Sequence, residues 1–146
     1  MLDVKEFIES QEKEVTGVTP FKVNILNSCD KILDESPDLD LESRLDKVSF
    51  SNSLIALDTN IKMLERYYDV TPNIKTPNHY AGSQDVISFL EDRMLNAEFV
   101  CSMIFNIVKY TVRLGRKDDE AKEVEKIRIY FTRMKNFIEN GNSLHD

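Results

Sequence analysis

The sequence predicts an all-α protein that folds as a compact bundle of about five to six helices. Apolar residues recur three and four positions apart along most of the chain, which is the period of an amphipathic helix. The chain holds only 4 Gly and 4 Pro among 146 residues, too few for the many turns of an all-β fold. With 41% apolar residues, a chain of this length can bury one hydrophobic core.

Four helical segments, of which the first is short and the third is weak, are expected in the acidic N-terminal region, residues 1–70. Their expected ranges are 2–14, 19–34, 39–48 and 54–69. Thr19 is a candidate N-cap of the second helix, and Pro20 then takes its first position. Ser49, Ser51 and Ser53 are candidate N-caps of the fourth helix, which separates it from the weaker helix before it.

Residues 71–78 contain two prolines and are interpreted as a linker to a C-terminal helical domain, residues 79–140. Three helices are expected in that domain, over about 84–94, 98–114 and 120–139. Gly115 and a short charged turn separate the last two helices, which are therefore expected to form a hairpin. Residues 141–146 are expected to be a frayed tail.

Two apolar stripes with heptad-like spacing mark the strongest helices. They run through Leu54, Leu57, Ile61, Leu64 and Tyr68, and through Val124, Ile127, Phe131, Met134 and Ile138. Each stripe covers only two repeats, which fits antiparallel packing inside a bundle or pairing between subunits. We expect packing inside the bundle, with a homo-oligomer as the alternative.

The helix expected over 98–114 carries a polar stripe on an otherwise apolar surface. Residues 99–108 are apolar almost throughout, so this helix is expected to be buried. Asn106, Lys109 and Arg113 nevertheless share one face, because they are three and four positions apart. Buried charges need partners. Either the stripe binds an anionic ligand, or it pairs with acidic residues of a neighbouring helix or faces solvent.

Charge is unevenly distributed along the chain. Residues 1–70 have 15 acidic and 8 basic side chains, a net charge of −7, whereas residues 98–139 have 9 basic and 7 acidic side chains, a net charge of +2. An acidic protein is not expected to bind duplex nucleic acid. The locally basic region suits a small anionic ligand, although the overall charge can also serve solubility alone.

The sequence predicts a protein of the cytoplasm with no membrane contact. It has no N-terminal signal with a basic and then an apolar stretch, and no apolar run of the ~20 residues that a membrane span needs. Cys29 and Cys101 lie among apolar residues, so we expect two buried free thiols in a reducing compartment.

Common motifs of phosphate and zinc sites are missing. The sequence has no GxxxxGK[ST] motif, and it combines two histidines with no CxxC motif. His79 is a candidate phosphate ligand or proton carrier, and Tyr80 a candidate stacking partner for a base. Alternatively, His79 caps a helix and Tyr80 closes the edge of the core.

Arg116 and Lys117 precede three acidic residues at positions 118–120. Such a junction can hold a phosphate together with Mg²⁺, which prefers carboxylate and phosphate oxygens. Alternatively, the acidic residues only favour the N-terminus of the last helix.

Glu123, Lys126 and Tyr130 follow on the last expected helix. Glu123 can pair with Lys126, three positions away. In a hairpin, Glu123 can instead reach Lys109 or Arg113.

Residues 77–131 resemble a family of small phage proteins of formally unknown function, whose core corresponds to the expected hairpin. The resemblance rests on Pro77-Asn78-His79-Tyr80, Asp85-Val86-Ile87, Asn106-Ile107-Val108-Lys109-Tyr110-Thr111-Val112-Arg113, Lys117 and Glu123-Val124-Glu125-Lys126-Ile127-Arg128-Ile129-Tyr130. This chain has the bulkier Phe105 and Ile127 where the family usually has Gly and Ala.

One branch of that family, in short-tailed coliphages, includes an early protein described as a nucleoside-monophosphate kinase without a P-loop. The resemblance implies a nucleotide ligand and phosphoryl transfer, which mainly needs positioning and charge neutralisation. The expected catalytic residues are His79, Lys109 and Arg113. The expected ligand-binding residues are Tyr80, Asn106, Tyr110, Arg116, Lys117 and Tyr130. Asp119 and Glu123 are the expected Mg²⁺ ligands.

Two other functions stay open. A non-enzymatic phage protein in the host cytoplasm can bind and modulate a host factor, with residues 1–70 as its surface. An all-α nucleoside-triphosphate pyrophosphohydrolase holds Mg²⁺ between acidic clusters on paired helices. Asp119, Glu120 and Glu123 supply one such cluster, and a second is not evident in the sequence.

Overall fold

The computed structural model describes residues 3–12, 14–71, 85–116 and 119–144, and it is all-α throughout these ranges. Its elements are α1 (Val4–Gln11), α2 (Thr19–Glu35), the 3-10 helix η1 (Ser36–Asp38), α3 (Arg44–Tyr67), α4 (Val86–Glu91), α5 (Asn96–Arg113) and α6 (Glu120–Asn140). The predicted fold class, an all-α bundle, is confirmed. Of the predicted linker, residues 72–78 lie outside the described ranges.

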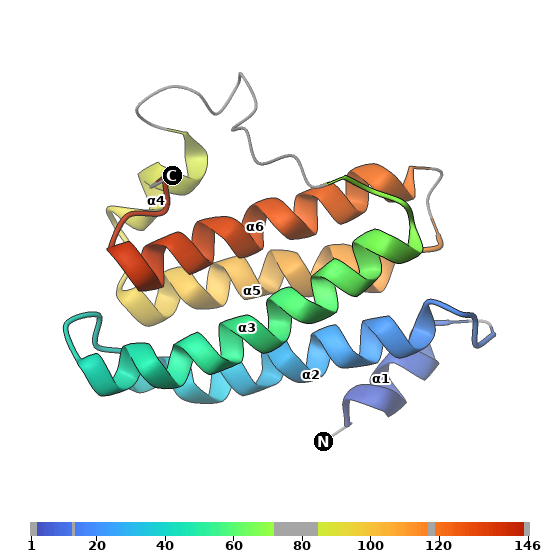
Figure 1. Ribbon diagram of the computed structural model, residues 1–146, viewed down its shortest axis with the longest axis horizontal. Coiled ribbons are helices and arrows are strands. Elements are labelled where there is room, and N and C mark those ends of the chain that lie inside the picture. Colours follow the sequence, from blue (N-terminus) through green and yellow to red (C-terminus); the bar gives the residue numbers. More distant parts are fainter. Residues whose placement is uncertain (1–2, 13, 72–84, 117–118, 145–146) are drawn as a thin grey trace.

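Among the described residues, four long helices, α2, α3, α5 and α6, form the bundle (Figure 1). α5 packs along α6 as the predicted hairpin, and α2 packs along α3. These two pairs are joined because α2 also packs on α5 and α3 on α6. α1 lies beside the N-terminal part of α2, and α4 lies at the end of the bundle where α5 begins (Figure 1).

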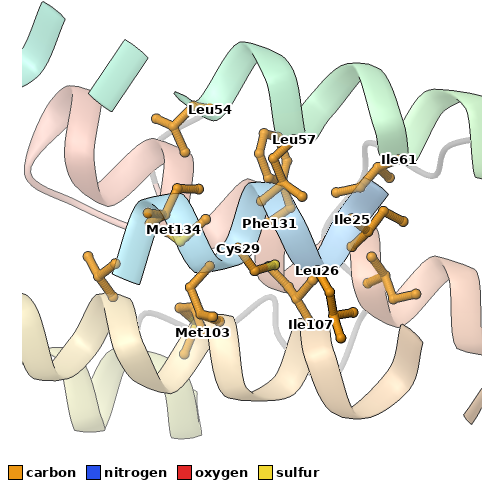
Figure 2. Packing of buried hydrophobic residues seen from close by; sticks show 14 of the residues in the cluster. Ile25, Leu26, Cys29, Leu54, Leu57, Ile61, Met103, Ile107, Phe131 and Met134 are labelled. Carbon is orange, nitrogen blue, oxygen red and sulfur yellow. The ribbon is translucent and has the colours of Figure 1, made fainter. Parts of the chain in front are cut away.

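The core fills the space between these four helices. Figure 2 shows side chains from α2, α3, α5 and α6 meeting there, among them Leu26, Leu57, Ile107 and Phe131. Leu54 to Leu64 of the first predicted stripe and all five residues of the second are at most 1% exposed. Burying each large apolar side chain contributes about 1.5–3 kcal/mol. Both stripes therefore pack inside the bundle as expected, and a homo-oligomer stays a prediction.

α3 joins two helices that the sequence predicts as separate. Two of the three serines expected to cap the second of them instead bond to the neighbouring helix. Ser53 Oγ donates to Glu35 Oε1 at 3.0 Å, and Ser49 Oγ donates to Glu35 Oε2 at 3.4 Å. With these hydroxyls engaged by α2, the backbone continues as one helix from Arg44 to Tyr67.

The ends of α5 and α6 are close to those predicted. Gly115 (φ +84°) follows α5 and Gly141 (φ +72°) caps α6, and both adopt the left-handed conformation that glycine accepts without strain. The expectation that α5 is buried all round is wrong, because Phe105 is 67% exposed.

None of the helices in the described ranges combines the length and the hydropathy that crossing a membrane requires.

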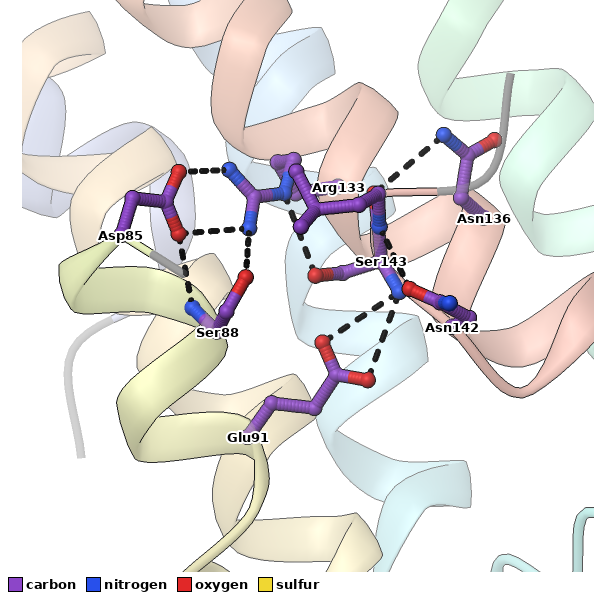
Figure 3. Close-up of polar contacts among 8 residues, drawn as sticks. Asp85, Ser88, Glu91, Arg133, Asn136, Asn142 and Ser143 are labelled. Atoms are coloured by element: carbon purple, nitrogen blue, oxygen red, sulfur yellow. Dashed lines mark hydrogen bonds and ion pairs between the residues drawn. The ribbon is translucent and has the colours of Figure 1, made fainter. Parts of the chain in front are cut away.

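A buried arginine network connects α4 and Ser143, which follows α6, to Arg133 of α6 (Figure 3). Arg133 Nη1 and Nη2 donate to the two carboxylate oxygens of Asp85 at 2.6 and 2.9 Å. Arg133 Nε donates to Ser143 Oγ at 3.1 Å, and the Ser143 amide donates to Glu91. The sequence predicts that residues 141–146 fray. This prediction is wrong for residues 141–144, because Ser143 is fully buried.

Candidate functional site

A pair of stacked tyrosines marks the predicted site on the α5–α6 hairpin. Tyr110 of α5 and Tyr130 of α6 have ring centroids 5.9 Å apart and ring planes 17° apart. Both side chains are half-buried. The stack is possible because the antiparallel hairpin brings the C-terminal half of α5 beside the N-terminal half of α6 (Figure 1).

Three cationic side chains surround the ring of Tyr110. Lys109 Nζ lies 4.7 Å from the ring centroid, Lys126 Nζ 5.0 Å and Arg113 Cζ 5.6 Å. Cations at such distances are attracted by the negative face of an aromatic ring. We call these five residues, Lys109, Tyr110, Arg113, Lys126 and Tyr130, the tyrosine–cation surface.

Arg113 is partly neutralised by a carboxylate from the facing helix. Its Nη2 lies 3.6 Å from Glu123 Oε1, which confirms the pairing predicted for a hairpin. The Glu123 side chain is only 7% exposed, and its Oε2 has no hydrogen-bond partner among the described residues. Lys109 and Lys126, by contrast, are exposed and form no ion pair with any described carboxylate.

Asn106 and Arg116, two further predicted ligand-binding residues, lie outside this group. Asn106 extends the polar stripe one turn toward the start of α5, and its Nδ2 donates to the carbonyl of Ser102 at 3.0 Å. Arg116 lies beyond the end of α5 and lines a pocket of about 460 Å³ beside Glu12 and Lys22. The tyrosine–cation surface therefore holds only part of the predicted residue set.

Three predicted site residues, His79, Tyr80 and Lys117, lie outside the described residues. Their roles stay predictions that follow from the sequence and from the resemblance.

Asp119 and Glu123, the predicted Mg²⁺ ligands, have separate partners. Asp119 caps α6: its Oδ1 accepts the Lys122 amide at 3.1 Å, and its Oδ2 lies 3.5 Å from Lys122 Nζ. Glu123 faces Arg113. Within the described ranges, no group of three or more His, Cys, Asp or Glu side chains is placed to hold a metal ion. Because Mg²⁺ can also be held by one or two carboxylates together with phosphate oxygens, the Mg²⁺ site and the pyrophosphohydrolase both stay predictions.

Lys22 is a buried charge that the sequence did not single out. It is 1% exposed, and its Nζ donates to the carbonyls of Leu114 at 2.6 Å and Val112 at 3.2 Å. These carbonyls end α5, so the ammonium caps that helix where its dipole is negative. Lys22 Nζ also lies 2.7 Å from Glu12 Oε1, an ion pair that is not aligned as a hydrogen bond.

Burial raises the pKa of the Glu12 carboxyl, but its partners outweigh this effect. The close ion pair with Lys22, the hydrogen bond from Thr19 and the positive charge of Arg116 hold its pKa below the ordinary value. Thr19 Oγ1 donates to Glu12 Oε2 at 2.6 Å, so its hydroxyl serves this ion pair rather than the start of α2.

Lys126 belongs to the tyrosine–cation surface, although the sequence predicts only that it pairs with Glu123. It lies three positions after Glu123 and four before Tyr130, so a helix places all three on one face. Its contact with Tyr110, however, depends on how far α5 and α6 are rotated about their axes. Only the structure shows that rotation.

Comparison with known proteins gives one result for the region that holds this site. Residues 74–132 match a family, DUF3310, that is described as a protein of unknown function. A search of curated proteins and a search of solved structures gave no significant match. The matched segment contains α4, α5 and all five residues of the tyrosine–cation surface. Over residues 74–132 the chain is thus similar to the DUF3310 family, whose function is not assigned.

Proposed function

We propose that this chain binds a nucleotide, or another small ligand that joins a phosphate to a flat ring, on the tyrosine–cation surface. The observation that supports this most is the convergence of Lys109, Arg113 and Lys126 within 5.6 Å of one tyrosine ring. Lysine and arginine are the usual phosphate ligands of proteins, and a tyrosine ring can stack on a base.

The charge of this surface suits a phosphate monoester. Of the three cationic side chains, only Arg113 pairs with a described carboxylate, that of Glu123, which leaves a formal excess of two positive charges. A phosphate monoester carries about −1.5 to −2 at neutral pH. The two exposed lysines can turn toward such a ligand without breaking an ion pair to a described residue.

We extend the proposal to phosphoryl transfer onto a nucleoside monophosphate, the activity that the phage-family resemblance implies. Phosphoryl transfer requires in-line positioning and neutralisation of the transferred group. Lys109 and Arg113 would supply the neutralising charge. A kinase assay with radiolabelled ATP and each nucleoside monophosphate tests this second step once binding is established.

The binding proposal is tested by a thermal-shift screen against nucleoside mono-, di- and triphosphates, with and without Mg²⁺. A ligand at 100 times its Kd stabilises the folded state by about 2.7 kcal/mol. This raises Tm by several degrees in a chain of this size. We expect a shift with at least one nucleotide, and its loss in Lys109→Ala and Arg113→Ala.

Arg66→Ala is the matched control, because Arg66 is exposed on α3 and its loss changes the net charge equally. A shift that persists in Lys109→Ala, or disappears equally in Arg66→Ala, places the ligand elsewhere. No shift with any nucleotide contradicts the proposal. Because Lys109 is exposed, its variant keeps the test valid even where Arg113→Ala loses stability.

A further inference from the structure

An acidic groove with an apolar floor lies on another part of the molecule. It has a volume of about 680 Å³ and opens between α1, α2 and α5. Phe7 of α1, Leu33 of α2 and Val108 of α5 contribute apolar surface. None of its lining residues belongs to the tyrosine–cation surface, so a ligand here would be independent of the proposed nucleotide.

The groove exists because α1 is shorter than the helix it covers. α1 has 8 residues and α2 has 17, which correspond to lengths of about 12 and 26 Å. α1 lies beside the N-terminal part of α2 (Figure 1). Beyond α1, the groove follows α2 for two turns, from Leu26 to Asp34. The open stretch is thus a continuation of a surface that already binds one amphipathic helix of this chain.

Acidic side chains border this stretch. Asp3, Asp30 and Asp34 line the groove, and the lining includes no Lys or Arg. Asp30 and Asp34 are exposed and form no ion pair with any side chain in the described part of the chain. They are four residues apart on α2, so they are spaced by about 6 Å along its axis. Basic residues four positions apart on a partner helix would have the same spacing.

We propose that this groove binds a basic amphipathic helix of a partner protein. The apolar face of that helix contacts Phe7, Leu33 and Val108, and its Lys or Arg side chains pair with Asp30 and Asp34. Binding of an amphipathic helix in a hydrophobic groove is a common mode of peptide recognition. Phe105, three positions before Val108 on α5 and 67% exposed, extends the apolar contact area beside the groove.

The test uses an 18-residue fluorescein-labelled helical peptide with leucines on one face and lysines on the other. A matched peptide replaces every lysine by glutamate. We expect the lysine peptide to bind the full chain in fluorescence anisotropy at physiological salt, and the glutamate peptide not to bind. The double variant Asp30→Lys/Asp34→Lys is expected to bind the lysine peptide about tenfold more weakly, since two attractive contacts become repulsive.

Asp92→Lys/Glu125→Lys is the matched control, because both residues are exposed, lie outside the groove and change the net charge by the same amount. We expect it to retain peptide binding within about twofold. Equal weakening in both double variants would show attraction by net charge alone and would overturn the proposal. So would equal binding of the two peptides, or no binding of the lysine peptide.

The same variants separate this proposal from two others. If the free chain self-associates in sedimentation velocity and Asp30→Lys/Asp34→Lys abolishes that association, the occupant is a second copy and the proposal fails. Lys109→Ala is expected to leave peptide binding unchanged. Asp30→Lys/Asp34→Lys is expected to leave a nucleotide-induced Tm shift unchanged, so each proposal can fail alone.

Discussion

Glu123 limits how strongly Arg113 can attract an anion. Its carboxylate lies 3.6 Å from the guanidinium and is almost fully buried. One of its oxygens has no hydrogen-bond partner among the described residues. A buried carboxylate of this kind is only partly compensated. At the scale of single residues, the Arg113–Glu123 pair therefore lowers the positive charge of the tyrosine–cation surface and also affects the stability of the α5–α6 hairpin.

Glu123→Gln is expected to strengthen phosphate binding. The substitution keeps the size of the side chain but removes the negative charge that competes with the ligand for Arg113. We expect Kd for the bound nucleotide to fall by about fivefold, which corresponds to about 1 kcal/mol. Isothermal titration calorimetry measures the change. Weaker binding in this variant would mean instead that Glu123 orients Arg113 or contacts the ligand itself.

Asp85 is expected to make folding stability depend on pH in the acid range. Hydrogen bonds from Arg133 are the main reason that its pKa falls from 3.8 to about 2. A carboxyl whose folded-state pKa is lowered stabilises the protein above its unfolded pKa and loses that contribution as pH falls toward the folded value. The stabilisation from Asp85 is thus complete only above about pH 5 and is lost progressively as the pH falls through about 2.

Asp85→Asn therefore tests the network of Figure 3. At pH 7 we expect a loss of about 2 kcal/mol or more in the free energy of unfolding, because Arg133 stays buried without a counter-charge. The difference in the free energy of unfolding between Asp85→Asn and the parent chain is expected to shrink as the pH falls toward 2. Urea unfolding at several pH values measures this, with the exposed Asp92→Asn as control. A constant difference across the acid range would exclude titration of Asp85 as the cause.

At the scale of elements, Lys22 connects the start of the chain to the end of α5. Its ammonium contacts two carbonyls at the end of α5 and the carboxylate of Glu12, which follows α1. The last carbonyls of a helix have no partner within the helix. A side chain of α2 thus completes α5, and the α1–α2 turn becomes part of the bundle.

Lys22→Met is expected to destabilise the protein by about 3 kcal/mol, because it leaves the carboxylate of Glu12 and two helix carbonyls without their cation. Lys22→Met/Glu12→Gln should regain part of that loss, since the buried negative charge is then removed. Lys31→Met, on the exposed face of α2, is the control. Chemical denaturation measures all three variants. A loss below ~0.5 kcal/mol in Lys22→Met would show that water replaces the ammonium.

Helix type was predictable from the sequence, whereas helix boundaries and side-chain partners depended on packing. The 3- and 4-residue spacing of apolar positions is a local property, and it predicted α2, α5 and α6 well. Ser49 and Ser53 do not act as the predicted caps, because their partner, Glu35, belongs to another helix.

In the candidate site, too, local spacing was predictable from the sequence, whereas contacts that depend on packing were not. The hairpin followed from the short connection after Gly115, and the Arg113–Glu123 pair followed from the hairpin. The stack of Tyr110 on Tyr130 did not follow, because it depends on the rotation of two helices. The burial of Lys22 did not follow either, since a lysine on a helix is normally exposed.

At the scale of the whole molecule, the acidic N-terminal helices and the helices of the matched segment share one core. α2 packs on α5 and α3 packs on α6. Arg128 of α6 pairs with two carboxylates of α3: its Nη1 lies 2.6 Å from Asp58 Oδ1, and its Nη2 lies 2.6 Å from Glu65 Oε1. The side chain of Glu65 is almost fully buried. Separating the two parts would expose apolar surface on both and leave a buried carboxylate without its partner.

Cutting the chain within residues 72–84 therefore tests the division into two domains that the sequence predicts. We expect residues 1–71 alone to show no cooperative unfolding, because Leu54, Leu57 and Ile61 would lose the helix that covers them. Mixing with the C-terminal fragment is expected to restore helical signal and a cooperative transition. Circular dichroism during thermal unfolding measures both. A cooperative transition in residues 1–71 by themselves would establish an independent domain.

The tyrosine stack also gives the protein an intrinsic optical reporter. The chain contains five tyrosines and no tryptophan, so tyrosine emission is not lost by energy transfer to an indole. Tyr110 and Tyr130 lie with their rings nearly parallel, beside three cationic groups. A base that stacks there would quench two of the five fluorophores, and the signal would be absent from Tyr110→Phe/Tyr130→Phe. The surface that we propose binds the ligand would therefore also report its arrival, without any added label.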